Sequence, residues 1–562
     1  MKVNEIRYER VTLEETKEKI AAAVDAVRGA KSGKDLAEIR EKMVKPAMVD
    51  FYTAASLCNA RYTQDTRDAF YKAEMDYYDE VGPLMQDAYL QFTNALLDSP
   101  YRKEAEAFIN LLVFANYELA RKAHSPEIIA DEQEESRLVT AYSALMSQMQ
   151  FDWEGKKVPM PIIRGKMQAD DRAVRRAAAE ALGRGMAEHA TELDDLYDQL
   201  VRVRDRQAKK LGLRSYTALG YYRMGRIDYD REMVETFRDN VLADIVPAAK
   251  RIKEEVARAL GWESVMLYDD AVYFGGGQPE PKLSAEGILE AGREMYRKMS
   301  PETGKFMDKM LAAGAFDVLS RDGKWGGGYC TEFTKYEQIF ILANFNGSSG
   351  DVDVVTHEFG HGFAMDMQFQ SGDWELQVGG METAECHSMS MEFFCWKYMD
   401  LFFDDAEKYK LKHLLDSFTF IPYGCMVDEF QHIVYDNPSL TPAERKETWN
   451  RLEAKYRPYL TTKGIPYLEE GTRWQYQMHI YESPFYYIDY CLAQTVALGF
   501  LLASRKDYDG AFEKYCAFCR KGGTERFSEL VREAGVPSPF EEGALKTVAD
   551  GVTALYGALK AQ

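Results

Sequence analysis

The sequence has 562 residues, 46% of them hydrophobic and 29% charged, which is ordinary for a globular protein and allows several domains around a large core. Its formal net charge of −21 repels nucleic-acid phosphates and anionic lipid, so neither is an expected partner. We expect no signal peptide and no membrane span, and the eight scattered cysteines favour reduced thiols in a cytoplasm over a disulfide framework.

The first 150 residues predict an almost entirely helical region. Thr12 followed by Glu15 is the pattern of a capping box, and it opens a helix that runs to Gly29. Further long stretches rich in Ala, Glu, Lys and Leu are expected to be helical at 34–58, 64–97, 102–123 and 126–149. Aromatic and Met residues at helical spacing in this region are typical of a core. We therefore expect an N-terminal helical domain over residues 1–165.

The remaining residues, 166–562, are expected to form a second domain that is also helical. A short β-hairpin around Glu154-Gly155 precedes it. Helices are expected at 169–188, 190–211, 215–220, 230–260 and 284–299, and again beyond residue 374 except for a loop at about 462–485. Residues 315–346 differ, because a glycine-rich turn is followed by the β-branched and aromatic run Gln338–Phe345. The chain therefore predicts a mainly α fold with one small sheet.

His357, Glu358 and His361 form the pattern H-E-x-x-H within Val352–Gln368. Two helical residues four apart lie on one face, so both imidazoles can bind one metal ion. Glu358 lies about 100° further round the helix, where its carboxylate can take a proton from a water that the metal activates. Asp353, one turn earlier, is a candidate to contact His357. With 8 His in 562 residues a chance match is rare, and the pattern indicates a catalytic site with one Zn²⁺ per chain.

A catalytic zinc needs a third protein ligand and one open position. Ala364 and Met367 stand where the metzincin pattern needs Gly and His, so that class is excluded. The carboxylates that follow are Glu375, Glu382, Glu385 and Glu392. Spacing alone does not separate Glu382 from Glu385. Glu392 lies two helical turns after Glu385 and is either a partner that hydrogen-bonds a ligating histidine or a solvated, ion-paired residue.

The segments HEFGH and TAECHSMSMEFF resemble the thimet oligopeptidase and oligoendopeptidase F family of zinc metallopeptidases. In that family the third ligand lies in an E-x-x-S-x-x-x-E helix, which here is Glu385-x-x-Ser388-x-x-x-Glu392, so the resemblance selects Glu385. The likeness covers roughly residues 150–545 and points to the Pz-peptidase-like oligoendopeptidases in particular. It implies two helical halves flanking a deep channel that admits short unfolded peptides, with the zinc on its floor.

The segment Tyr476–Tyr490 is dense in phenol and imidazole groups. Such donors, aimed at the oxyanion of peptide hydrolysis, lower the barrier to the reaction. In the family a histidine followed by tyrosines at this place closes over the substrate. The resemblance therefore assigns His479 to a substrate carbonyl and Tyr486 or Tyr490 to the oxyanion. Tyr487 is an expected substrate contact that an aromatic core explains equally well.

The glycine-rich turn and the strand after it are the expected peptide-binding surface. Gly327 and Gly328 let a substrate backbone approach closely. The run Gln338–Phe345, which ends in Asn344 and Phe345, could hydrogen-bond a peptide as an added strand. The alternative is an ordinary turn followed by an edge strand.

These features together predict a zinc endopeptidase that hydrolyses internal bonds of short, unfolded oligopeptides, with Glu358 as the general base. One alternative is a zinc carboxypeptidase of the same chemistry, which needs a cation to anchor a free C-terminus. The other is a non-catalytic helical peptide-binding protein, which has no use for Glu358. Expected partners are short peptides, with no nucleic acid and no membrane, and the sequence does not decide between a monomer and a homo-oligomer.

Overall fold

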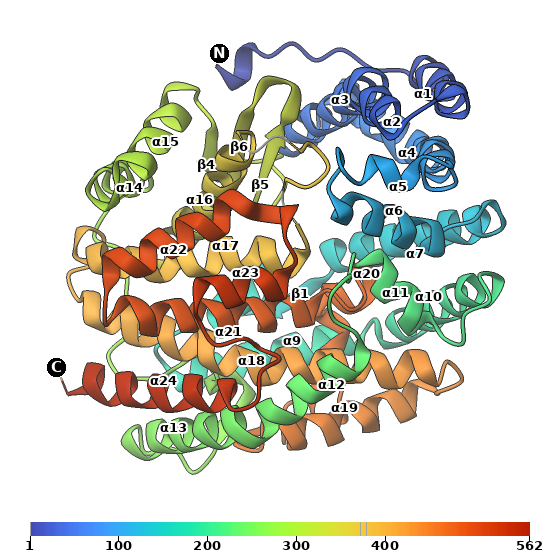
Figure 1. Ribbon diagram of the computed structural model, residues 1–562. Helices are drawn as coiled ribbons and strands as arrows, with labels where there is room; N and C mark the ends of the chain where they lie inside the picture. The colour runs from blue at the N-terminus through green and yellow to red at the C-terminus, as the bar shows by residue number, and fades with distance from the viewer. Residues whose placement is uncertain (1, 371–372, 378, 562) are drawn as a thin grey trace. The chain divides into compact units, whose positions relative to one another are not determined.

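The computed structural model describes residues 2–370, 373–377 and 379–561 (Figure 1). The chain divides into two units, each built from three separate segments. Unit 1 is Met1–Lys122, Glu280–Ala406 and Ala503–Val536, and unit 2 is Ala123–Pro279, Glu407–Leu502 and Pro537–Gln562. The units interleave along the chain, and the hairpin before residue 165 packs on the helix after it.

Unit 1 packs helices around a three-stranded sheet. Its helices are α1 (Leu13–Gly29), α2 (Gly33–Ile39), α3 (Lys45–Gln64), α4 (Ala69–Leu97), α5 (Arg102–Ala105), α6 (Leu111–Ala123), α14 (Ala285–Met299), α15 (Pro301–Ala312), α16 (Ser349–Gln368), α17 (Met381–Phe394), α22 (Tyr508–Lys521) and α23 (Phe527–Ala534). The predicted start of the first helix is confirmed, because the Thr12 hydroxyl accepts a hydrogen bond from the Glu15 N–H.

Over its described residues, unit 2 is helical apart from four short strands and the connecting loops. Its helices are α7 (Ile129–Gln148), α8 (Met160–Lys166), α9 (Arg172–Ala187), α10 (Ala190–Lys210), α11 (Tyr216–Arg223), α12 (Arg231–Asn240), α13 (Val246–Ala259), α18 (Ala406–Asp436), α19 (Pro442–Tyr456), α20 (Met478–Glu482), α21 (Tyr487–Ser504) and α24 (Ala544–Lys560). Strands β1 (Gln150–Trp153) and β2 (Lys156–Pro159) form the predicted hairpin, while β3 (Val265–Met266) pairs with β7 (Leu460–Thr461). Glu154 and Gly155 both take positive φ, as a two-residue hairpin turn requires.

The sheet of unit 1 has the strand order β4-β6-β5, where β4 is Phe316–Leu319, β5 is Tyr329–Phe333 and β6 is Gln338–Phe345. Strand β6 pairs in parallel with β4 and antiparallel with β5. The prediction that Gln338–Phe345 accepts a peptide as an added strand is therefore wrong, because the main chain of β6 is hydrogen-bonded on both sides. Strands β4 and β5 are the two edge strands of this sheet within the described residues.

Helix α16 carries the H-E-x-x-H pattern and packs on β5, β6 and α17 (Figure 1). Val352, Val355, Phe359 and Phe363 are all buried, so the helix is embedded in the core as its apolar faces predicted. The predicted fold class, mainly α with a small sheet beside this helix, is confirmed.

Helix α21 is long and apolar enough by composition to cross a membrane, but 72% of it is buried inside the protein. That degree of burial is typical of the core helix of a globular unit. All eight cysteines are free thiols.

Candidate active site

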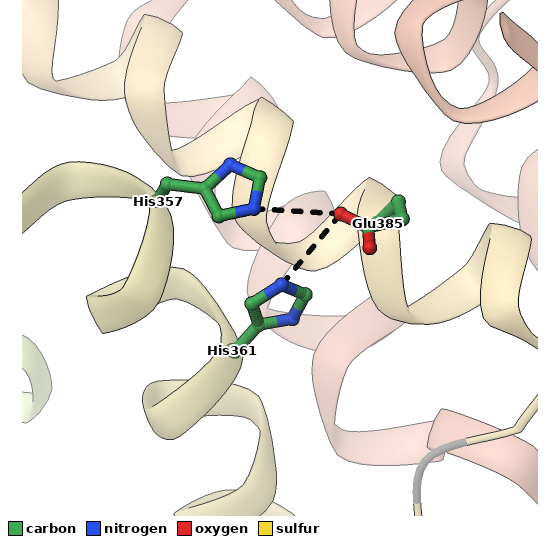
Figure 2. A group of neighbouring side chains, drawn as sticks. All are labelled: His357, His361 and Glu385. Carbon is green, nitrogen blue, oxygen red and sulfur yellow. Dashed lines mark ion pairs between the residues drawn. The ribbon is translucent and has the colours of Figure 1, made fainter. Parts of the chain in front are cut away.

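His357 and His361 project from α16 toward Glu385 on α17 (Figure 2). Nε2 of His357 lies 3.5 Å from Oε2 of Glu385, and Nε2 of His361 lies 3.6 Å from the same oxygen. One potential ligand atom from each residue lies within 4.8 Å of the other two. Zinc bonds of about 2.1 Å in a tetrahedron separate ligand atoms by about 3.4 Å. The three side chains therefore fit a single ion of this size.

The second ring nitrogen of each histidine makes a hydrogen bond of its own, and these bonds orient the two imidazoles. Nδ1 of His357 lies 2.6 Å from Oε1 of Glu392, and His361 hydrogen-bonds the main-chain carbonyl of Ala384. Burial lowers the pKa of His361 to about 4, which favours the neutral imidazole that a metal binds. Of the two candidates to contact His357, Glu392 is the one that meets its Nδ1. The half-buried Asp353 offers its main-chain carbonyl to the Thr356 hydroxyl.

The structure distinguishes among the downstream carboxylates as candidates for the third metal ligand, which their spacing in the sequence did not. Glu385 is 5% exposed, and its Oε2 accepts a hydrogen bond from the Ser388 hydroxyl at 3.1 Å. Glu382 is equally buried, but its carboxylate folds back over Gly380 at the start of α17. Glu375 is held by Arg40 and by the hydroxyls of two tyrosines, Tyr89 and Tyr117. Of these carboxylates, only Glu385 belongs to the group that could hold a metal.

Glu358 lies on α16 beside the metal group and faces strand β5. The main-chain N–H of Cys330 donates a hydrogen bond to its carboxylate. Burial raises the pKa of Glu358, and the nearby carboxylates of Glu385 and Glu392 raise it further. A carboxylate with a raised pKa can both accept and release a proton near neutral pH.

Two glycines let α16 approach its neighbours closely. A Cβ on Gly360 would lie 2.7 Å from the carbonyl oxygen of His387 and 2.7 Å from the Cα of Ser388, both on the backbone of α17. A Cβ on Gly362 would lie 3.1 Å from the side chains of Ile339 and Phe306. The absence of a side chain at Gly360 therefore sets the separation of the helix that carries the histidines from the helix that carries Glu385.

We expect Gly360→Ala to destabilise the protein by about 1–3 kcal/mol, because the backbone of α17 must shift to admit the methyl group. The same shift should weaken metal binding. Thermal unfolding and metal stoichiometry are the measurements. Gly557→Ala on α24 is the matched control, since a Cβ there meets nothing within 4 Å. An unchanged unfolding midpoint for Gly360→Ala would contradict the packing argument.

The predicted peptide-binding residues of unit 1 form a braced turn. Nδ2 of Asn344 donates hydrogen bonds of 2.8 Å to the carbonyls of Trp325 and Gly327. The Trp325 ring lies against Gly327, while Gly328 passes close to the main chain of β6. Phe345 is only 6% exposed and belongs to the core. The contacts of Asn344 and Phe345 therefore support the turn and the sheet.

The predicted aromatic group lies in unit 2 and is centred on His479 of α20. The centroid of its ring is 5.8 Å from that of Tyr486, 5.0 Å from that of Tyr487 and 5.9 Å from that of Tyr490. The Tyr486 and Tyr490 rings are themselves 4.8 Å apart. The structure therefore brings together all four predicted residues of this segment.

His479 is oriented by two residues that carry no sequence motif. The Gln477 amide nitrogen lies 2.9 Å from Nδ1 of His479, and the Tyr423 hydroxyl donates to the Gln477 amide oxygen at 2.7 Å. Because the amide donates to Nδ1, the imidazole proton lies on Nε2. The sequence analysis missed Gln477 and Tyr423, because the partner of Gln477 comes from α18, 54 residues away.

The turn between α20 and α21 is held by buried polar groups. Phe485 takes a φ of +68°, a conformation that non-glycine residues rarely adopt. Its N–H donates to the Gln431 side chain at 3.0 Å, and its carbonyl accepts from Arg226, which also pairs with Asp489 at 3.0 Å. These contacts fix the backbone directly before Tyr486.

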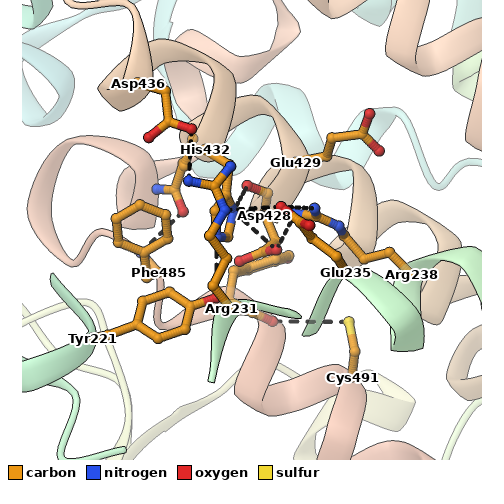
Figure 3. Close-up of polar contacts among 12 residues, drawn as sticks. Tyr221, Arg231, Glu235, Arg238, Asp428, Glu429, His432, Asp436, Phe485 and Cys491 are labelled. Carbon is orange, nitrogen blue, oxygen red and sulfur yellow. Dashed lines mark hydrogen bonds and ion pairs between the residues drawn. The ribbon is translucent and has the colours of Figure 1, made fainter. Parts of the chain in front are cut away.

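A second buried pair lies beside this turn (Figure 3). Arg238 contacts Asp428 at 2.7 Å, and the Tyr221 hydroxyl lies 3.0 Å from Nε2 of His432, the histidine one helical turn after Asp428. The Phe485 ring packs edge-on against His432, with the ring centroids 4.8 Å apart. This buried network therefore packs against Phe485, the residue directly before Tyr486.

Comparisons with known proteins identify the family. The model of peptidase family M3 matches residues 166–550, and that of the peptidase M3 N-terminal domain matches residues 3–124. The chain is 42% identical to Pz peptidase A solved with an inhibitor, over 99% of each chain, with a TM-score of 0.94.

Two proteins assigned as oligoendopeptidase F are also similar. One is 40% identical over 100% of each chain with a TM-score of 0.95. The other, from Bacillus anthracis str. Ames, is 39% identical over 99% of this chain and 98% of its own, with a TM-score of 0.89. The comparison with curated proteins gave no match. The chain therefore belongs to peptidase family M3 and is a metalloendopeptidase of the oligopeptidase kind.

Proposed function

We propose that His357, His361 and Glu385 hold one Zn²⁺ and that the protein cleaves internal bonds of short, unfolded peptides. The observation that carries the proposal is the convergence of three ligand atoms within 4.8 Å of one another. Glu392 supports it as the acceptor for the His357 Nδ1 proton, since carboxylate–histidine pairs of this kind orient metal ligands.

Bound zinc supplies positive charge that polarises the scissile carbonyl and makes water acidic enough to attack near neutral pH. Glu358 accepts the proton of the attacking water and passes it to the leaving amine. The N–H of Cys330 holds the Glu358 carboxylate in place for both transfers. The edge of β5 that does not pair with β6 is the surface we propose for the peptide main chain, in place of β6 itself.

We further propose that His479 donates its Nε2 proton to a substrate carbonyl and that Tyr486 or Tyr490 stabilises the oxyanion. The tautomer that Gln477 imposes on His479 supports the first role. The family resemblance supports both roles, as it does the substrate channel between helical halves. Tyr487 and the turn at Gly327 and Gly328 are proposed substrate contacts, and the cytoplasm is the proposed location.

The proposal is tested with a fluorogenic peptide blocked at both ends. We expect cleavage of an internal bond, loss of activity with a chelator, and recovery on adding Zn²⁺. Cleavage of a doubly blocked peptide excludes the carboxypeptidase alternative, and turnover of any peptide excludes the pure binding protein. A preparation that contains stoichiometric zinc but cleaves no peptide would overturn the proposal.

Glu392→Gln is expected to weaken zinc binding by roughly 10- to 100-fold, because the amide is a poorer acceptor for the His357 Nδ1 proton. Competition with a fluorescent zinc chelator measures the affinity. Glu290→Gln, at an exposed position of α14, is the control and should leave the affinity unchanged. If Glu392→Gln also leaves it unchanged, Glu392 is an ordinary ion-paired residue.

Tyr486→Phe and Tyr490→Phe separate the two oxyanion candidates. Removing a donor that contacts the oxyanion costs roughly 10²- to 10³-fold in kcat, so one variant is expected to lose activity on that scale while KM changes little. The other should lose far less, because the ring packing between the two tyrosines is retained. Full activity in both variants would remove the tyrosines from the mechanism.

A further inference from the structure

A cavity of about 260 Å³ lies in unit 2, bordered by the residues that precede His479. Its wall includes Arg473 and Tyr476 from the segment directly before α20, and Tyr423 from α18. Tyr423 is the residue that orients Gln477, which in turn orients His479. The cavity is therefore joined by direct contacts to a proposed substrate-binding side chain.

Arg473 is half-buried and has an unusual environment for a guanidinium. Its Nε and Nη1 atoms are inaccessible to solvent and have no hydrogen-bond partner within the described residues. The guanidinium stacks on the Tyr423 ring at 4.1 Å and lies 5.9 Å from the centre of the Tyr476 ring. Aromatic faces favour a cation, but they do not accept the in-plane N–H groups. The guanidinium therefore has no acceptor for these two donors among the described residues, and Nη2 is its one nitrogen that is not in the buried, unpartnered set.

The charges around Arg473 do not balance. Asp270 is shared between Arg457 and Lys253, whose Nζ lies 3.0 Å from the Asp270 carboxylate. Glu453 lies 3.3 Å from Arg457. Arg473 is thus a third cation beside two carboxylates that already have partners. Burying an unpaired charge is costly, so this arrangement favours an anion in the cavity.

One further carboxylate lines the cavity, and its negative charge would disfavour the binding of an anion there. Asp416 is neutralised by Lys412 at 2.5 Å, and its other oxygen accepts from the Tyr273 hydroxyl at 2.7 Å. The exposed Arg164 also lines the cavity and adds positive charge at its rim. The cations therefore outnumber the unpaired carboxylates at this wall.

We infer that this cavity binds a carboxylate of the substrate peptide through Arg473, either the free C-terminus or the side chain of an Asp or Glu residue. A guanidinium presents several N–H donors that match the two oxygens of a carboxylate, and such charge-assisted bonds are the strong ones. The inference rests on the proposed function, because the ligand is the same peptide that we propose His479 contacts.

Matched pairs of peptides test the inference. The ratio of kcat/KM between the two peptides of a pair does not change when a variant loses activity toward all peptides equally. One pair differs only in a free C-terminal acid or a C-terminal amide, and the others carry Asp or Asn, or Glu or Gln, at single positions. For the wild type we expect kcat/KM to be about 10- to 100-fold higher for the acid in at least one pair. The pair that shows the preference identifies the source of the carboxylate.

Arg473→Met keeps much of the apolar stem over Tyr423 but removes the charge, so we expect the preference to fall to about one. Arg473→Lys should retain part of it, because the charge remains while the planar donor set is lost. Arg451→Met, at an exposed position of α19, is the control and should keep the full preference. A preference that survives Arg473→Met but disappears in Arg164→Met would overturn the assignment.

Binding supplies a second measurement that does not depend on turnover. In a Glu358→Gln background, the Kd of the preferred acid should rise about 10- to 100-fold when Arg473→Met is added, while the Kd of the amide stays the same. Equal cleavage of acid and amide in every pair by the wild type overturns this inference and leaves the proposed function standing. No cleavage of any peptide by zinc-loaded enzyme instead contradicts the proposed function.

Discussion

Glu358→Gln is expected to keep the metal and to lose turnover, with kcat lower by roughly 10³-fold, within the 10²- to 10⁴-fold range of general acid–base catalysis. The amide has nearly the same shape and can still accept the hydrogen bond from Cys330, but it cannot take a proton from water. It also lies outside the group of atoms that could hold the metal. The measurements are kcat on a doubly blocked peptide and zinc content per chain.

A matched control for this variant lies on the same helix. Asp366→Asn makes the same chemical change at the far end of α16, where the carboxylate pairs with Lys309 at 2.5 Å and touches none of the metal-binding group. It should keep both activity and zinc. Full activity in Glu358→Gln would exclude this residue as the general base, whereas loss of zinc from that variant would show that it also supports the ion.

The metal-binding helix could be predicted from sequence because its chemistry and its periodicity are both local. His357 and His361 share one helical face by spacing alone, and the apolar residues around them fix which faces are buried. Glu385 was different. The direction of its side chain depends on how α17 packs on α16 through Gly360, so only a family resemblance separated it from Glu382.

The position of β6 in its sheet was predicted wrongly, although the sequence held a signal. Strand β6 reads QIFILANF, an apolar run with almost no alternation, which is typical of a strand covered on both faces. Its parallel partner β4 begins 22 residues earlier, and pairing over that distance depends on tertiary packing. The edge strand β5 is shorter and less buried than β6. Its hydrophobic pattern is therefore weak and did not indicate an edge strand.

The residues that support the aromatic group could not be predicted from sequence at all. Arg226, Arg473 and Gln477 are polar, and in a sequence such residues suggest a solvated surface. Their surroundings depend on residues that are distant in sequence, as with Arg226 and Asp489, which lie 263 positions apart. The same long-range pairing explains the interleaved units, because each unit is completed by segments from three parts of the chain.

Glu385→Gln is expected to abolish both zinc binding and activity, because a neutral amide is a much weaker ligand than a carboxylate and Ser388 then orients the wrong group. A ligand that binds only the folded protein stabilises it by about 4 kcal/mol at a thousand times its Kd. A chelator should therefore lower the unfolding midpoint of the wild type but leave that of Glu385→Gln unchanged. This readout does not depend on turnover.

Glu382→Gln is the decisive comparison, because Glu382 is the neighbour that spacing could not distinguish from Glu385 and is buried to the same extent. Its carboxylate lies over Gly380 and away from the histidines, so this variant should keep its zinc and its sensitivity to the chelator. If Glu382→Gln loses the metal while Glu385→Gln retains it, the third ligand is Glu382, and α17 must turn about its axis when the ion binds.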